Sequence, residues 1–324
     1  MSPATEPFDS AAITGYKTRM SCAPAASPRL RALGTLTLIG CAALWSLNGP
    51  LIKLLNQAGV PGISTACYRS LIGGLVFLPL ALARLGTLRN VAPVWPIAGI
   101  VTFTVMTASF VIANTLTAAA NAIILQYTSP IWVFLLSPLI LHERPARVEG
   151  IALLISMAGV ATIFSGNPDT SPVGLLVALT SGVGYGTLTV LLRRLRLVSP
   201  AVVSALNTLG SGLLLIVPVA VWGRFDLTAQ QWRLMLLLAL VQFTFPYLMF
   251  SWALQHVEAH RAALLLLLET VLNPVWTYLV VREVPPAATL IGGPLIVAGV
   301  VLSLLLTWRR TRRQRPPLPG PGIA

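Results

Sequence analysis

The sequence predicts an all-α polytopic membrane protein with ten transmembrane helices arranged as two inverted five-helix repeats. Three observations predict this fold class: an apolar composition, ten apolar segments of membrane-spanning length, and an internal repeat. Of the 324 residues, 56% are hydrophobic and 10% are charged, and the mean hydropathy is +0.81. Soluble globular domains are about a quarter charged, so this composition excludes a soluble domain.

Ten apolar segments result when the chain is divided at proline, glycine and charge clusters. Each approaches the ~20 residues that a helix needs to cross the hydrocarbon core of a bilayer. No charge marks the break between the third and fourth segments, which lies between Asn114 and Asn121. The segments are residues 33–55, 63–83, 93–113, 118–141, 147–165, 172–192, 200–222, 232–254, 261–281 and 287–308.

The positions of lysine and arginine predict the orientation, because short cytoplasmic loops retain these residues. With ten spans and the N-terminus inside, most of the 22 basic residues lie on the inner side, whereas only Arg224, Arg233 and Arg282 lie outside. We therefore expect a plasma-membrane protein of the bacterial inner-membrane type with both termini cytoplasmic. Residues 1–32 are expected to be a disordered basic tail and residues 309–324 a basic, proline-rich tail. The net charge of +13 then reflects topology, and no nucleic-acid partner is expected.

The chain also resembles itself at an offset of 140 residues, as from Glu143 to Glu283. At the same offset Lys53 meets Arg193, and the Glu-x-Pro pattern is kept in both copies. The predicted repeats span residues 33–165 and 172–308. Because five spans is an odd number, the second copy must enter the membrane from the opposite side. Inverted repeats are typical of secondary transporters, with the substrate site near the midplane between the halves.

This pattern resembles the drug/metabolite transporter superfamily, specifically its EamA-type carriers, over about residues 33–307. The resemblance implies a secondary active transporter of small polar or amphipathic metabolites, such as amino acids or drug-like compounds, and it favours export. It rests on Trp45-Ser46-Leu47-Asn48 followed by Lys53, on Tyr68-Arg69-Ser70 before Gly73-Gly74, and on the helix ends Leu141-His142-Glu143-Arg144 and Val281-Arg282-Glu283.

Glu269 is the candidate site residue that stands out, since it follows five leucines in the ninth segment. A carboxylate there costs about 3 kcal/mol by insertion scales, so it should face the protein interior and be paired, protonated or hydrated. One interpretation is a cavity residue that responds to protons or substrate; the other is a helix-packing residue. EamA-type carriers often have proline directly after this glutamate. Here Thr270 takes that place, so we expect a softened helix one turn later, at Pro274.

Two basic residues at membrane depth allow two interpretations each. Arg69 either meets an anionic substrate group or an acid, or reaches the lipid headgroups; Lys53 either lines the cavity or reaches the headgroups. Further polar residues predict a moderately polar, aromatic-lined pocket, although each one is individually compatible with helix packing. The predicted cavity residues are Glu269, Asn273, Arg69, Trp45, Asn48, Tyr68, Tyr185 and Gln242, and Tyr127, Asn207 and Tyr247 belong to the same polar set.

The remaining motifs argue against other functions. The sequence contains no Walker A loop and no hydrolase signature, so neither an enzyme nor a cofactor is expected. His256, Glu258 and His260 have poor spacing for a metal site, and no metal is expected. The expected partners are a small-molecule metabolite, the lipid bilayer and protons as a candidate coupling ion. An intramembrane enzyme and a non-transporting receptor or scaffold remain as alternatives.

Overall fold

The computed structural model describes residues 28–89, 91–140, 149–166, 171–254, 256–257, 262 and 265–313. Within these ranges the regular structure is helical, without strands. The elements are α2 (Pro28–Trp45), α3 (Asn48–Gln57), α4 (Gly62–Leu82), η1 (Leu85–Leu88), α5 (Val94–Leu116), α6 (Ala119–Gln126), α7 (Ser129–Ile140), α8 (Glu149–Ser165), α9 (Pro172–Arg194), α10 (Pro200–Trp222), α11 (Ala229–Leu236), η2 (Leu237–Thr244), α12 (Phe245–Ala253), α14 (Leu268–Val281) and α15 (Ala287–Arg313).

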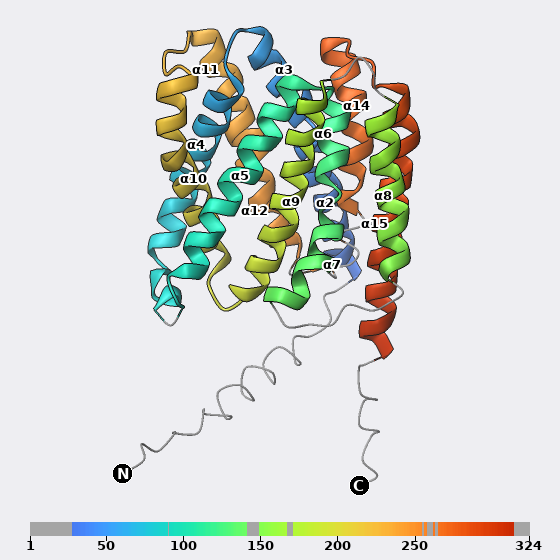
Figure 1. Cartoon of the computed structure of the whole chain (residues 1–324). Coiled ribbons are helices and arrows are strands. Elements are labelled where there is room, and N and C mark those ends of the chain that lie inside the picture. Colours follow the sequence, from blue (N-terminus) through green and yellow to red (C-terminus); the bar gives the residue numbers. More distant parts are fainter. Residues whose placement is uncertain are drawn as a thin grey trace, which may run out of the picture.

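Eight helical segments of the described chain are long and apolar enough to cross a membrane, and Leu153–Ser165 is a shorter apolar helix. The protein is therefore an integral, multi-pass membrane protein. The helices stand side by side in one bundle (Figure 1). The eight segments are Pro28–Gln57, Gly62–Leu82, Val94–Leu116, Ala119–Ile140, Pro172–Arg194, Pro200–Trp222, Ala229–Ala253 and Ala287–Leu306.

The terminal helices extend beyond the boundaries expected from hydropathy. α2 begins at Pro28 rather than at residue 33, and α15 continues to Arg313 rather than ending at residue 308. Hydropathy marks where a helix leaves the hydrocarbon, whereas backbone hydrogen bonds can continue the helix into the polar region. The rest of the two expected tails, residues 1–27 and 314–324, lies outside the described residues.

Three long helix pairs organise the bundle: α4 packs along α10, α8 along α15, and α5 along α9. Glycines permit the close approach in the first two pairs. A Cβ placed on Gly74 would lie 2.6 Å from the Leu209 Cα, and one placed on Gly159 would lie 2.6 Å from the Gly292 carbonyl oxygen. In a bilayer, helices associate largely through such tight packing. Gly159 and Gly292 therefore serve the close packing of α8 against α15.

We expect Gly159→Ala to destabilise the protein, because its methyl group would meet the backbone of α15. Overpacking of this kind costs roughly 1–3 kcal/mol, which should lower the melting temperature of the detergent-purified protein. Gly150→Ala on the same helix is the matched control, since a Cβ there has no atom within 4 Å. The close-packing interpretation is wrong if both variants melt at the wild-type temperature or above it.

Candidate functional site

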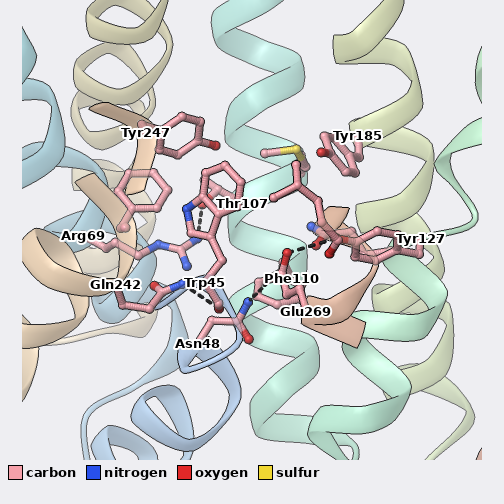
Figure 2. Close-up of a pocket in the computed structure, with 14 residues that line it drawn as sticks. Trp45, Asn48, Arg69, Thr107, Phe110, Tyr127, Tyr185, Gln242, Tyr247 and Glu269 are labelled. Atoms are coloured by element: carbon pink, nitrogen blue, oxygen red, sulfur yellow. Dashed lines mark hydrogen bonds between the residues drawn. The ribbon is translucent and has the colours of Figure 1, made fainter. Parts of the chain in front are cut away.

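A cavity of about 100 Å³ lies among the helices and receives side chains from both halves of the chain. Figure 2 shows Arg69 and Gln242 on one side of it and Glu269 and Tyr127 on the other. The walls combine aromatic rings with a few polar groups, as ligand-binding pockets commonly do. The lining residues are Trp45, Asn48, Arg69, Met106, Thr107, Phe110, Gln126, Tyr127, Tyr185, Gln242, Phe243, Tyr247, Leu266 and Glu269.

Helix interruptions place several of these residues in the cavity. Pro50 has no N–H to donate to the Ser46 carbonyl, and α2 ends at Trp45 just before α3 begins. Pro130 lies in the first turn of α7 and has no N–H to donate to the carbonyl of Gln126, the last residue of α6, which Tyr127 follows. Irregular backbone at membrane depth is tolerated where it lines a cavity. The two interruptions thus explain why Trp45, Asn48, Gln126 and Tyr127 face the cavity.

The second half of the chain contributes two further irregular segments. η2 is a π-helix, and Pro246 just beyond it lacks the N–H that an α-helix would direct at the Gln242 carbonyl. The other interruption is a turn at Leu267, immediately before α14. The softening expected at Pro274 is therefore misplaced, since α14 continues through this proline and the break precedes Glu269. Leu267 matches Tyr127 at the 140-residue offset, so the two interruptions occupy equivalent positions of the repeat.

Glu269 is held by neutral donors. Asn48 Nδ2 donates to Glu269 Oε1 at 3.0 Å, and the Tyr127 hydroxyl donates to Oε2 at 3.0 Å. Asn273 Nδ2 in turn donates to Asn48 Oδ1 at 2.5 Å and to the Ser46 carbonyl that Pro50 leaves free, at 3.1 Å. Glu269 is 9% exposed, and no basic group lies within ion-pair distance of it in the described part of the chain. The carboxyl group is thus buried, oriented and not neutralised by a cation.

Arg69 projects from α4 into the cavity and is only 4% exposed. Its Nη2 donates to Thr107 Oγ1, and its guanidinium carbon lies 4.7 Å from the centre of the Phe243 ring. Both partners are neutral, and the described residues place no carboxylate within ion-pair distance. The interpretation that Arg69 reaches lipid headgroups is therefore wrong, because its guanidinium lies inside the protein.

The structure brings most of the predicted cavity residues together. Trp45, Asn48, Tyr185 and Gln242 all line the cavity with Arg69 and Glu269. Gln242 Nε2 donates to the Trp45 carbonyl at 3.0 Å, which joins the two halves at the break after α2.

Three members of the predicted polar set lie elsewhere. Asn273 is fully buried behind the cavity wall, where it supports Asn48. The Tyr68 hydroxyl donates to the Phe225 carbonyl at 2.7 Å, which directs its ring away from the cavity and toward Trp232. Asn207 lies in a separate small pocket formed by α10, by Pro96 of α5 and by Leu195, which follows α9. These three residues have structural contacts rather than a place in the cavity wall.

Lys53 forms an ion pair with Glu283 at the end of the bundle where α3 and α14 terminate (Figure 1). Lys53 Nζ lies 2.6 Å from Glu283 Oε2 and donates to the Thr117 carbonyl at 2.8 Å. Glu283 Oε1 accepts from the Ala119 backbone N–H at 2.7 Å. Lys53 therefore neither lines the cavity nor reaches freely for headgroups, because it ties α3 to the α5–α6 connection and to the segment after α14.

Sequence reasoning did not find several wall residues. Met106, Thr107, Phe110, Phe243 and Leu266 resemble ordinary residues of apolar helices, and no hydropathy signal separates a cavity face from a packing face. Gln126 carries the same signal as Gln242, a side-chain amide within an apolar segment, and could have been predicted from it. Of the three residues weighed as a metal site, Glu258 and His260 lie outside the described residues, and His256 Nδ1 lies 3.0 Å from the Trp252 carbonyl oxygen. The described part of the chain contains no group of three metal-ligating side chains.

Comparison with known proteins gives the family. The model of the EamA-like transporter family matches the chain twice, over residues 32–165 and 172–305. The chain belongs to the EamA-like transporter family. The two matches cover most of the chain, and the cavity takes residues from both of them.

Relatives of this EamA-like transporter are named as transporters. An uncharacterized transporter of Archaeoglobus fulgidus is 28% identical, over 81% of this chain and 93% of the relative. The pseudopaline exporter CntI of Pseudomonas aeruginosa is 26% identical, over 83% of this chain and 94% of its own length. A solved crystal structure has the same fold, with a TM-score of 0.59 and 22% identity, over 86% of this chain and 99% of that one. The EamA-like protein is accordingly a transporter and not an enzyme.

Proposed function

We propose that this EamA-like transporter is a secondary active carrier that exports small polar or amphipathic metabolites, such as amino acids or drug-like compounds, by alternating access. The observation that carries the proposal is the polar, aromatic-lined cavity between the two family-matched segments. Secondary transporters bind substrate at such a position, beside discontinuous helices. The relative named as a pseudopaline exporter supports export rather than import.

The proposed architecture has ten transmembrane helices in two inverted repeats, residues 33–165 and 172–308, in a bacterial-type inner membrane with cytoplasmic termini. Two features support the repeats: the double family match and the helix interruptions that recur at the same offset. Figure 1 supports the placement of both termini on the same side of the membrane, since α2 begins and α15 ends at the same end of the bundle. The excess of basic residues predicted for that side supports its cytoplasmic placement.

Protons are the proposed coupling ion, and Glu269 is the proposed proton-binding residue. Its carboxyl group is buried in the cavity, and its described partners, Asn48 and Tyr127, are both neutral hydrogen-bond donors. A site of this kind can change its protonation state when the cavity opens to a different side or takes up substrate. Transport needs no cofactor in this proposal, because the proton gradient supplies the free energy for substrate accumulation.

Substrate counterflow in liposomes tests the proposed function. Purified protein should exchange an external radiolabelled metabolite against the same unlabelled metabolite inside, in a screen of amino acids and small amphipathic compounds. Exchange without chemical change supports a carrier. Chemical turnover without flux would support the intramembrane enzyme, and binding without either would support the receptor or scaffold.

A further inference from the structure

Two short connections meet at the end of the bundle where α2 begins and α15 ends (Figure 1). One joins α4 to α5 and contains η1, and the other joins α9 to α10. The Ser199 backbone N–H donates to Thr87 Oγ1 at 3.2 Å. Leu195 and Val198 pack in one apolar cluster with Leu88. The two connections therefore form one continuous surface.

Four exposed arginines, here called the arginine surface, lie on these connections. Arg84 and Arg89 flank η1, whereas Arg194 ends α9 and Arg196 follows it closely. None of the four forms an ion pair with a residue that the structure describes. Neither connection contains an acidic residue in the sequence. The arginine surface therefore carries positive charges that no carboxylate of the two connections neutralises.

The arginine surface lies at the boundary of the hydrocarbon core. The candidate membrane spans of α4 and α9 end at Leu82 and Arg194, and those of α5 and α10 begin at Val94 and Pro200. The four arginines thus lie within a few residues of the points where these helices leave the lipid. Arginine side chains at such positions place their charge at the level of the lipid headgroups.

Exposed apolar side chains accompany the arginines. Leu85, Val94 and Leu197 are 45%, 60% and 72% exposed. The Arg194 guanidinium carbon lies 4.9 Å from the ring centre of Trp95, in the first turn of α5, and tryptophan is enriched at membrane interfaces. This combination fits a phospholipid, because its phosphate matches the guanidinium groups and its acyl chains match the apolar side chains.

The number of arginines follows from topology, but their arrangement does not. Topology depends on how many basic residues a loop carries and not on contacts between loops. Here the two connections are hydrogen-bonded to each other, and Arg194 and Trp95 add a second contact between the helices that lead into them. The small pocket lined by Leu88, Leu195 and Asn207 has no room for a water molecule, so a partner must contact the outer surface.

We propose that the arginine surface binds the phosphates of anionic phospholipids, with their acyl chains against Leu85, Val94 and Leu197. The proposal goes beyond the transport function and depends neither on the substrate nor on the direction of transport. Anionic lipids are favoured over zwitterionic ones because an arginine close to an anionic membrane surface strengthens binding about fivefold. The surface would hold such lipids against the ends of α4, α5, α9 and α10.

Native mass spectrometry of the purified full-length protein tests the lipid class. Dioleoyl phosphatidylglycerol and dioleoyl phosphatidylcholine have the same acyl chains and differ in headgroup charge. The protein should bind phosphatidylglycerol at least about tenfold more tightly, and this preference should shrink as the ammonium acetate concentration rises, because exposed charges are screened. Equal binding of the two lipids would overturn the proposal. Tighter binding of poly-glutamate than of phosphatidylglycerol would indicate an acidic protein as the partner and would overturn it as well.

Arginine variants locate the lipid site. Glutamine at all four positions should abolish the preference for phosphatidylglycerol, and the pair Arg84→Gln and Arg89→Gln should lower the ratio of the two affinities at least about fivefold. Arg309→Gln removes an exposed arginine on α15 at the same end of the bundle and should leave that ratio unchanged.

The pair decides the outcome if the fourfold glutamine variant does not insert into the membrane, since topology also depends on these charges. Lysine at all four positions keeps the charges and should retain the preference for phosphatidylglycerol. A wild-type ratio of the two affinities in the pair, or an equal loss in Arg309→Gln, would contradict the arginine surface. Arginines with a purely structural role would change the melting temperature and not the ratio of the two affinities.

Discussion

Glu269→Gln should abolish substrate accumulation driven by a pH gradient while leaving counterflow intact. The glutamine amide resembles the neutral acid: its oxygen can accept from Asn48 Nδ2, and its nitrogen can donate to the Tyr127 hydroxyl oxygen. A gradient of one pH unit supplies about 1.4 kcal/mol per proton, which supports about tenfold accumulation. The variant should retain none of this accumulation, as measured in liposomes with an imposed gradient.

Two comparisons separate coupling from a structural role for Glu269. Asp226→Asn removes an exposed carboxylate outside the cavity and should preserve accumulation. Glu269→Leu removes the hydrogen bonds as well as the charge, so it should also lower the melting temperature. Gradient-driven accumulation at the wild-type level in Glu269→Gln would refute the coupling role and leave helix packing as the function of this residue.

Glu283→Gln should shift the transporter toward the state that is open at the end of the bundle where Lys53 lies. The substitution removes the charge pair, while the glutamine oxygen can still accept from the Ala119 N–H. The side chains of Lys53 and Glu283 are 14% and 24% exposed, so the pair is partly desolvated. Losing such a contact is worth roughly 1–3 kcal/mol, or about 5- to 150-fold in the ratio of two states.

Single cysteines, introduced into a variant whose native cysteines have been replaced, report this shift through their reactivity with thiol reagents. Ala118 lies between Thr117 and Ala119, whose backbone groups contact the ion pair. Leu195 directly follows α9, is buried, and lies at the opposite end of the bundle from the ion pair (Figure 1). Glu283→Gln should raise the reactivity of Ala118→Cys and lower that of Leu195→Cys. Arg282→Gln, which changes the neighbouring charge, should alter neither. Unchanged reactivity at both positions in Glu283→Gln would show that the pair does not control opening.

Hydropathy located eight membrane-spanning helices of the described chain, because it reports directly on the solvent that each segment meets. Residues such as Glu269, Arg69 and Gln242 were identifiable as well, because a polar group in an apolar segment is costly and must be accommodated. Tyr68 shows the limit of this reasoning. Its position in an apolar helix indicates that its hydroxyl has a partner, but only the tertiary structure reveals that the partner is the Phe225 carbonyl rather than a ligand.

The pairing of Lys53 with Glu283 illustrates a second limit. The 140-residue offset relates Lys53 to Arg193 and Glu143 to Glu283. Such an offset identifies equivalent positions in the two copies, but it does not predict that Lys53 of one copy contacts Glu283 of the other. The misplaced softening of α14 has a similar cause. Proline predicts a lost hydrogen bond, whereas neighbouring helices decide whether the helix bends there or continues.

In the proposed mechanism, one cavity opens alternately to the two sides of the membrane. Thiol reactivity of Ala118→Cys and Leu195→Cys, with and without a substrate identified by counterflow, tests this claim most directly. Because the cavity between the two halves can open at only one end at a time, substrate should change the two reactivities in opposite directions. Changes in the same direction at both positions would contradict alternating access.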